Sequence, residues 1–526
     1  MKTERTRIQA VELYDTTLRD GAQSEDVSFS IEDKLRIATE LDHLGIHYIE
    51  GGWPGANPKD SLFFKSIPHV GLKSAKIVAF GATCKARNKA ALDPQLAALL
   101  AADTEIVTLF GKSWTLHVTD ALSVSLEKNL AMISDSICFL RAAGRRVFYD
   151  AEHFFDGYLA DASYALKTLH AAEEAGAECL VLCDTNGAMM PWQVEEIVRS
   201  VRKAVSIPLG IHAHNDSETG VANALMAVYA GATQVQGTIN GFGERCGNAN
   251  LCSIIPNLKL KMKRDCISDT QLRRLKEVSH FVNETANLPH NKRQPYVGDS
   301  AFAHKGGIHV HAVRKRSDTY EHVLPDVVGN RQRILISDYG GASSLLAKAK
   351  EMGITLTDPQ ARELLATLKD LEHQGFQFES AEGSLELMIK KAVGTYRRFF
   401  ELVGFRILTE NVGAEPMAEA TVQINVDGHV EHTAATGNGP VNALDCALRK
   451  ALERFYPALK AVKLLDYKVR VLSGRDGTEA KVRVLIESGD GVRHWSTVGV
   501  SENIIEASWQ ALVDSIEYKL LMSSDT

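Results

Sequence analysis

Residues 177–216, AECLVLCDTNGAMMPWQVEEIVRSVRKAVSIPLGIHAHND, contain one complete structural unit. The apolar run at 178–183 predicts a buried strand, and the helical periodicity of 192–204, after a polar turn, predicts an amphipathic helix. A second apolar run at 208–212 predicts the next strand. The order strand, turn, helix, strand is typical of α/β proteins with parallel sheets.

The same unit repeats through the first 265 residues. Eight predicted strands alternate with helices over about 250 residues, which favours a (β/α)8 TIM barrel over an open doubly wound sheet. No GxGxxG or GxxxxGK[ST] loop is present, which argues against nucleotide binding. The predicted strands are 11–15, 47–51, 76–80, 105–110, 146–150, 178–183, 208–212 and 233–238. The predicted helices are 31–44, 60–67, 85–101, 122–143, 158–175, 192–204, 218–230 and 246–260.

The remainder of the chain follows other patterns. Helical stretches between 266 and 400, among them a long amphipathic connector at 380–400, predict helical linker subdomains. The tail contains a near-repeat, at 430–445 and 492–507, of strand, small-residue turn and helix. We therefore expect an α/β tail domain with an internal pseudo-repeat of two ββα halves. The expected domains are a TIM barrel at 1–265, helical subdomains at 266–400 and the tail domain at 401–526.

Composition restricts the functional class. The chain has 526 residues, 45% of them hydrophobic and 24% charged, with a net charge of −7 and no charged blocks. Nucleic-acid binding and a polybasic membrane anchor are therefore not expected. No apolar run approaches the ~20 residues of a membrane span, and residues 1–5 lead into no signal core. The eight dispersed cysteines without a CxxC pair predict free thiols and a cytoplasmic protein.

Polar residues that follow the predicted strands should form the active site, because barrel sites lie at the carboxyl ends of the strands. His212 and His214 lie on one face of the seventh strand, since side chains alternate along a strand. Asp20, after the first strand, would complete a three-ligand metal site, and Asn248 could add an oxygen. Such a mixed set suits Mg²⁺, Mn²⁺, Zn²⁺ or Co²⁺. The alternative for each histidine is a hydrogen-bonded core residue.

Further titratable residues are expected at the same end of the barrel. Asp150 and Glu152 share a strand face, and two close carboxylates would raise each other's pKa. Glu244 could orient a ligand, with a simple turn at the start of a helix as the alternative. Thr185 could bind a carboxylate or merely cap a turn.

The motifs DTTLRDGAQ (15–23), HAHND (212–216) and GTINGFGERCGN (237–248) closely resemble those of the isopropylmalate, homocitrate and citramalate synthases. AFAHKGGIHVHA (301–312) resembles the helical subdomain of that family, and GNGPVNALD (437–445) resembles its regulatory domain. The resemblance therefore covers nearly the whole chain.

Within the family, EGGWPGANPKD (50–60) and YDAEHFFDGY (149–158) look most like the citramalate synthase branch. We expect Trp53, Phe154 and Phe155 to narrow the acyl pocket toward the methyl group of pyruvate.

The resemblance implies a metal-assisted Claisen condensation of acetyl-CoA with a 2-oxo acid, pyruvate being favoured, followed by thioester hydrolysis. Arg19 would place a positive charge on the developing oxygen, and Thr185 would hold the oxo-acid carboxylate. The resemblance names Glu152, His309 and Tyr320 as the residues that handle protons, with His309 acting on the neighbouring subunit's barrel.

The resemblance also implies a homodimer and, for a synthase on the route to isoleucine, inhibition by isoleucine at the tail domain. The main alternative is a 2-isopropylmalate synthase, which condenses acetyl-CoA with 2-oxoisovalerate in leucine biosynthesis. A hydroxyacyl-CoA lyase is disfavoured by the regulatory tail, and a metal-dependent hydrolase by the position of HxH on the seventh strand. A non-catalytic amino-acid sensor is the remaining alternative.

Overall fold

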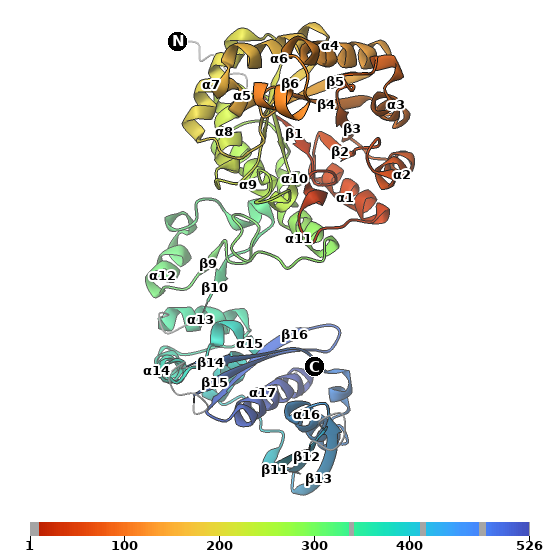
Figure 1. The fold of residues 1–526 in the computed structure, drawn as a ribbon. Helices are drawn as coiled ribbons and strands as arrows, with labels where there is room; N and C mark the ends of the chain where they lie inside the picture. The colour runs from red at the N-terminus through yellow and green to blue at the C-terminus, as the bar shows by residue number, and fades with distance from the viewer. Residues whose placement is uncertain (1–9, 336–340, 411–416, 473–479, 525–526) are drawn as a thin grey trace, which may run out of the picture. The chain divides into compact units, whose positions relative to one another are not determined.

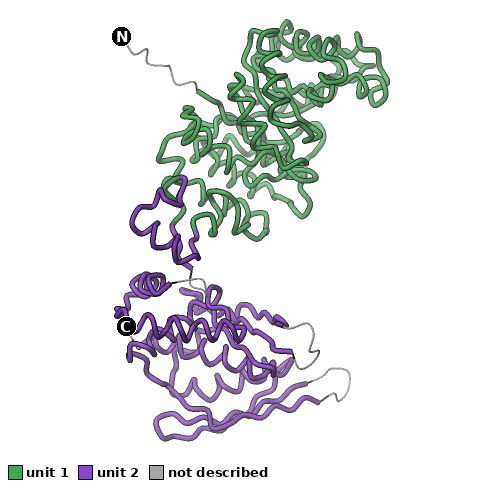
Figure 2. Tube along the Cα trace, turned by 90° about the vertical axis from the view of Figure 1, so that its left-hand side faces the viewer, with its two compact units in different colours: residues 1–302, 323–331 green, residues 303–322, 332–526 purple. Residues whose placement is uncertain are grey.

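The computed structural model describes residues 10–335, 341–410, 417–472 and 480–524. The chain divides into two compact units, Met1–Phe302 with Val323–Arg331 and Ala303–His322 with Gln332–Thr526 (Figure 2). Each unit has a hydrophobic core of its own. The three-part division at residues 265 and 400 stays a prediction.

Eight parallel strands form a closed barrel in the first unit, as the sequence predicts (Figure 1). Each strand pairs with the next along the chain, and β1 returns to pair with β8, with Tyr14 opposite Gln236. Closure satisfies the hydrogen-bonding groups that an open sheet leaves at its edges. The strands are β1 (Glu12–Asp15), β2 (Tyr48–Gly52), β3 (Lys76–Ala82), β4 (Ile106–Lys112), β5 (Arg146–Glu152), β6 (Cys179–Asp184), β7 (Leu209–Ala213) and β8 (Gln234–Gly237).

Helices surround the barrel, and local capping sets their ends. α1 begins after Ser30, which forms a capping box with Asp33, and ends at Gly45, whose φ of 91° suits glycine. The predicted helix 158–175 is interrupted, because Asp161 caps a new helix start, and the predicted helix 85–101 is α-helical only from Pro94, which follows the cap at Asp93. The helices of this unit are α1 (Ile31–Leu44), α2 (Pro58–Ser66), α3 (Pro94–Ala101), α4 (Leu126–Ala142), α5 (Phe154–Ala160), α6 (Ala162–Glu174), α7 (Pro191–Ala204), α8 (Gly220–Ala230), α9 (Leu251–Pro256), α10 (Asp269–Leu272) and α11 (Leu275–Thr285).

Two layers of buried side chains position the strands. Aromatic and small apolar residues such as Tyr14, Tyr48 and Phe148 pack with one another as one cluster of strand residues. A larger cluster, which includes Leu180 and Leu169, packs strands against helices. The strands are therefore held from both sides, and the loops at their carboxyl ends rest on a rigid scaffold.

The second unit begins with two short strands and the helices around them. β9 and β10 pair in parallel, and Gly375 ends α14 in the left-handed conformation. The predicted connector helix at 380–400 is wrong in its second half. α15 ends at Ala392, Gly394 follows with a φ of 74°, and an antiparallel strand begins at Glu401. The elements are β9 (Ala303–His304), α12 (Gly307–Lys315), β10 (Arg333–Ile334), α13 (Ala342–Glu351), α14 (Asp358–Gln374) and α15 (Glu382–Ala392).

The tail contains the predicted pseudo-repeat, although each half has three strands rather than two. The missed first strand of the tail, β11, lies at 401–410, beside the region assigned to the connector helix. Each half is an antiparallel sheet followed by one helix. The first comprises β11 (Glu401–Glu410), β12 (Met417–Val426), β13 (His429–Gly437) and α16 (Pro440–Leu452). The second comprises β14 (Lys463–Val471), β15 (Val482–Gly489), β16 (His494–Ser501) and α17 (Ile504–Ser524).

Two compositional expectations can be compared with the structure. All eight cysteines lie in described residues and are free. No helix in the described part of the chain is long and apolar enough to cross a membrane. Residues 1–5, on which the expectation about a signal segment depends, lie outside the described residues.

Truncation of the fully buried Leu180 tests the barrel core. We expect Leu180→Ala to lower the free energy of unfolding by about 2–5 kcal/mol, because it removes buried methyl groups and leaves a cavity. The matched control, Leu92→Ala, removes a side chain that is 76% exposed and should change stability by less than about 0.5 kcal/mol. Urea denaturation followed by circular dichroism measures both, and equal losses would contradict the assigned core.

Candidate active site

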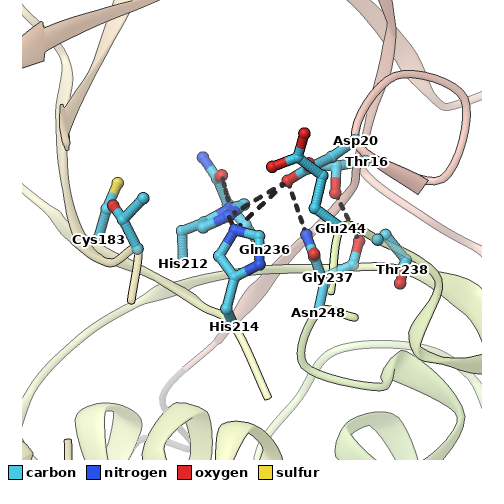
Figure 3. Close-up of polar contacts among 12 residues, drawn as sticks. Thr16, Asp20, Cys183, His212, His214, Gln236, Gly237, Thr238, Glu244 and Asn248 are labelled. Atoms are coloured by element: carbon cyan, nitrogen blue, oxygen red, sulfur yellow. Dashed lines mark hydrogen bonds and ion pairs between the residues drawn. The ribbon is translucent and has the colours of Figure 1, made fainter. Parts of the chain in front are cut away.

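Three potential metal-binding side chains converge at the end of the barrel (Figure 3). The Nε2 atoms of His212 and His214 lie 3.4 Å apart, and Oδ2 of Asp20 lies 3.3 Å from the first and 4.0 Å from the second. All three residues are buried. Their arrangement can hold one metal ion.

The closed barrel explains why residues so distant in sequence meet. His212 lies in β7 and His214 just beyond it, while Asp20 lies in the loop that follows β1. β8 stands between those two strands and pairs with both. The backbone of Asn248, in the loop after β8, forms a bridge with that of His214.

Hydrogen bonding around the cluster leaves acceptor atoms facing one another. Oε1 of Gln236 lies 2.9 Å from Nδ1 of His212, and a carbonyl oxygen can only accept, so this nitrogen carries the proton. When Nε2 of His212 is deprotonated, as metal binding requires, its lone pair points at Asp20 and His214. Facing acceptors repel unless a proton or a cation lies between them. This donor set fits a divalent metal ion, with Gln236 as the group that orients one ligand.

Asn248 contacts the cluster through its amide. Its Nδ2 donates to Oδ2 of Asp20 at 2.7 Å, while its buried Oδ1 has no hydrogen-bond partner among the described residues. The expectation of an oxygen ligand requires the opposite orientation of this amide. The two ends of an amide are distinguished only by their hydrogen bonds, and rotation by 180° would bring the oxygen to Asp20.

The charges around Asp20 keep it ionised. Burial by itself would raise the pKa of Asp20, but the Arg19 guanidinium and both histidines outweigh it and hold the pKa well below its ordinary value. Burial, together with the neighbouring His212, lowers the pKa of His214 to about 4. A carboxylate and a neutral imidazole are the forms that bind metal ions.

Arg19 is held in place from two sides. Its Nε donates to Oε1 of the fully buried Glu50 at 2.5 Å, and its guanidinium carbon lies 3.8 Å from the ring centroid of Phe80. Glu50 also accepts a 2.6 Å hydrogen bond from the hydroxyl of Tyr14. Sequence reasoning missed Glu50, which sits inside a quoted motif. A carboxylate at the end of a predicted strand was the available signal.

Glu152 and Thr185 lie where the sequence predicts, and each has a defined partner. The Glu152 carboxylate forms an ion pair with Nζ of Lys112, which sequence reasoning also missed. Oγ1 of Thr185 accepts a 2.9 Å hydrogen bond from the backbone N–H of His153. His153 has an unusual φ of 55° for a residue other than glycine. Because the Thr185 oxygen already accepts there, its own O–H remains available to donate.

Asp150 has a raised pKa, but not for the predicted reason. Burial, opposed by His212 and assisted by Glu50, raises the pKa of Asp150 to about 7. The predicted partner, Glu152, instead pairs with Lys112. Nε2 of Gln236 donates to Oδ1 of Asp150 at 3.1 Å, so the amide of Gln236 connects Asp150 with His212.

A pocket of about 200 Å³ surrounds these groups. Its aromatic wall consists of Trp53, Phe80 and Phe110. The prediction for Phe154 and Phe155 is wrong, because both are fully buried in the barrel core. The pocket is lined by Arg19, Asp20, Gln23, Trp53, Phe80, Phe110, Asp150, Glu152, Cys183, Thr185, His212, His214, Glu244 and Arg245.

His309 and Tyr320 belong to the second unit and form a pair of their own. Their rings stack with centroids 4.1 Å apart, His309 lying in the first turn of α12. Both side chains are exposed. Nearby, Nε2 of His304 lies 3.0 Å from the buried carboxylate of Glu321, which agrees with a structural role for His304.

Comparison with protein families identifies three segments. Residues 10–282 match the HMGL-like family, and residues 296–375 match the homocitrate synthase post-HMGL domain-like family. Residues 379–520 match the LeuA allosteric (dimerisation) domain.

Relatives cover nearly the full chain. An (R)-citramalate synthase of Geobacter sulfurreducens is 60% identical over 98% of this chain and 98% of its own length. An (R)-citramalate synthase of Aquifex aeolicus is 55% identical over 98% of this chain and 99% of its own length. A probable 2-isopropylmalate synthase of Methanopyrus kandleri is 33% identical over 96% of this chain and 97% of its own length.

The raised pKa of Asp150 predicts a pH-dependent stability. The folded protein holds this proton to about pH 7, whereas the unfolded chain releases it near the ordinary aspartate pKa of 3.8, so stability falls as the pH rises between these values. In EDTA-treated protein we compare the free energy of unfolding of Asp150→Asn with that of wild type. We expect this difference to change by about 2–3 kcal/mol in favour of the variant as the pH rises from 5 to 8. Urea denaturation at both pH values measures this.

The control for that measurement is Asp120→Asn, at an exposed aspartate, which should show no such change between the two pH values. A stability difference for Asp150→Asn that stays constant with pH would contradict the assignment.

Proposed function

This chain belongs to the HMGL-like family and, within it, to the (R)-citramalate synthases, and on this premise we propose how its residues perform the reaction. It is an acyltransferase. The proposed reaction joins acetyl-CoA and pyruvate and, with one water, releases (R)-citramalate and CoA. The convergence of Asp20, His212 and His214 beside Arg19 carries the proposal, since it provides a cation site and a fixed charge for a 2-oxo acid.

The three converging residues would hold one divalent cation, Mg²⁺, Mn²⁺, Zn²⁺ or Co²⁺, with Asn248 as a further oxygen donor after rotation of its amide. When bound, such a cation polarises the ketone of the oxo acid. Gln236 accepts the Nδ1–H of His212, so that Nε2 is the nitrogen directed at the cation. Asp150, on the far side of that amide, supports its orientation.

Arg19 stabilises the negative charge that develops on the ketone oxygen during carbon–carbon bond formation. Glu50 and Phe80 fix the guanidinium before substrate binds, so little reorganisation accompanies the reaction. Thr185 donates its free O–H to the carboxylate of the oxo acid. The two contacts would orient the ketone carbon toward the acetyl group.

Proton transfer is assigned to Glu152, His309 and Tyr320. Glu152 lines the pocket and pairs with Lys112, and its carboxylate is the group that would accept the methyl proton of acetyl-CoA. We place His309 and Tyr320 over the barrel of the partner copy in a homodimer, which the matched dimerisation domain supports. Their stacked rings would then act together, with Tyr320 supporting the hydrolytic step. Isoleucine is the proposed effector of the tail domain.

Relatives that carry the 2-isopropylmalate synthase name are less similar to this chain, at 33% and 30% identity. The aromatic wall of the pocket favours the small methyl group of pyruvate over an isopropyl group.

Substrate preference tests the function directly. With acetyl-CoA and thiol release as the readout, we expect kcat/KM for pyruvate to exceed that for 2-oxoisovalerate by about 100-fold, since the two oxo acids differ by two methyl groups. Mass spectrometry of the product should show citramalate. A larger kcat/KM for 2-oxoisovalerate would identify the chain as an isopropylmalate synthase instead.

Removal of one chelating side chain tests the metal site. We expect His212→Ala to lose both stoichiometric Mn²⁺ binding, measured by calorimetry, and more than about 99% of turnover, since one of three ligands and its orienting contact disappear. His69→Ala, at an exposed histidine, is the control and should retain both. Retained metal affinity in His212→Ala would contradict the assigned ligands.

A further inference from the structure

A buried ion pair lies behind the pocket. Nζ of Lys34, in α1, lies 2.5 Å from Oδ1 of Asp60, in α2. The two residues are only 4% and 5% exposed, and neither lines the pocket. A buried ion pair is weak evidence for stability, because desolvation of both charges offsets their attraction. The hydrogen bonds of Lys34 and Asp60 to the backbone indicate another role for this ion pair.

Both partners of the ion pair bind the turn that follows Glu50. Nζ of Lys34 donates to the carbonyl oxygen of Gly51 at 3.2 Å, and Oδ2 of Asp60 accepts the backbone N–H of Trp53 at 2.9 Å. Gly52 lies between them with a φ of 148°, and a Cβ there would lie 2.3 Å from Cγ of Asp60. The ion pair thus contacts the backbone on both sides of Gly52, where a side chain would collide with Asp60.

This turn presents Trp53 to the pocket. The indole packs edge-on against Phe80 and Phe110. Its ring centroid lies 5.9 Å from that of Phe80, with an angle of 87° between the ring planes, and 5.4 Å from that of Phe110, with an angle of 83°. The rings of Phe80 and Phe110 stack with their centroids 5.2 Å apart, and the guanidinium of Arg19 also lies against the ring of Phe80. The position of Trp53 therefore sets the space left beside the group that binds the oxo acid.

We infer that the Lys34–Asp60 ion pair is a positioning device for substrate selectivity. It fixes Trp53 as the wall that admits the methyl group of pyruvate and excludes longer 2-oxo-acid side chains. This inference rests on the proposed function and assigns its selectivity to residues outside the catalytic set. Aromatic packing alone would leave the backbone of the turn free to withdraw, whereas the ion pair holds the two peptide groups that flank Gly52.

The test compares pyruvate with 2-oxobutyrate, which has one more methylene, by thiol release. We expect Trp53→Leu to lower the preference for pyruvate by about tenfold, because it enlarges the pocket. Lys34→Met should shift the preference in the same direction and raise the KM for pyruvate more than it lowers kcat, because the chemical groups stay in place. Asp60→Asn keeps an acceptor for the Trp53 N–H but removes the negative charge that pairs with Lys34. It tests the effect of the ion pair on substrate preference if Lys34→Met fails to fold.

Fluorine NMR of protein labelled with 5-fluorotryptophan provides a readout independent of turnover. The chain has five tryptophans, and Trp53→Leu assigns the signal of Trp53. We expect Lys34→Met to shift or broaden this signal. Lys276→Met, which removes the lysine of another barrel-unit ion pair, with Asp299, is the matched control and should leave the signal and the substrate preference unchanged.

The outcomes separate the two proposals. A folded Lys34→Met with unchanged preference and an unchanged Trp53 signal overturns the positioning role, as does an unchanged preference in Trp53→Leu. If wild type turns over no pyruvate, the proposed function fails, and the Trp53 signal still decides whether the ion pair holds the turn.

Discussion

Pairing of β1 with β8 is the constraint on which the rest of the molecule depends. It closes the barrel and brings the loop after the first strand against the end of the seventh. Asp20 and His212 are separated by most of the barrel sequence, yet their ligand atoms lie 3.3 Å apart. Without closure the carboxylate and the imidazoles would occupy opposite edges of an open sheet, and no cation site could form.

Closure also concentrates charge in a region with little water, and the arrangement of charges decides which groups ionise. Asp20 has a cationic neighbour and two imidazoles, so its pKa falls despite burial. Asp150 is equally buried, but there burial outweighs the opposing charges of His212 and Arg19, so its pKa rises to about 7. Two aspartates at the end of the same barrel therefore differ in protonation through their neighbours alone. The amide of Gln236 lies between these two environments and bonds to a member of each.

Selectivity is organised differently from charge. The pocket wall is a set of interlocking aromatic rings, and the backbone behind Trp53 is held by Lys34 and Asp60, which contact no reacting group. Arg19 joins the two systems, because its guanidinium rests on Phe80 and pairs with Glu50. The same arginine is therefore part of the electrostatic centre and of the boundary of the substrate pocket.

Strand and helix periodicity in the sequence was enough to predict eight strands, their order and the barrel, because each unit is specified by local pattern and short turns. The convergence of Asp20, His212 and His214 could be predicted because barrel geometry dictates which strand ends meet. Sequence patterns could not predict the roles of Glu50, Lys112 and Gln236. They also could not predict the burial of Phe154 and Phe155 or the strand β11. These depend on which side chains from separate elements come into contact, and on where a glycine such as Gly394 ends a helix, and periodicity carries neither kind of information. Local pattern thus determined the scaffold, whereas packing across the closed barrel decided the partners and the protonation of each site residue.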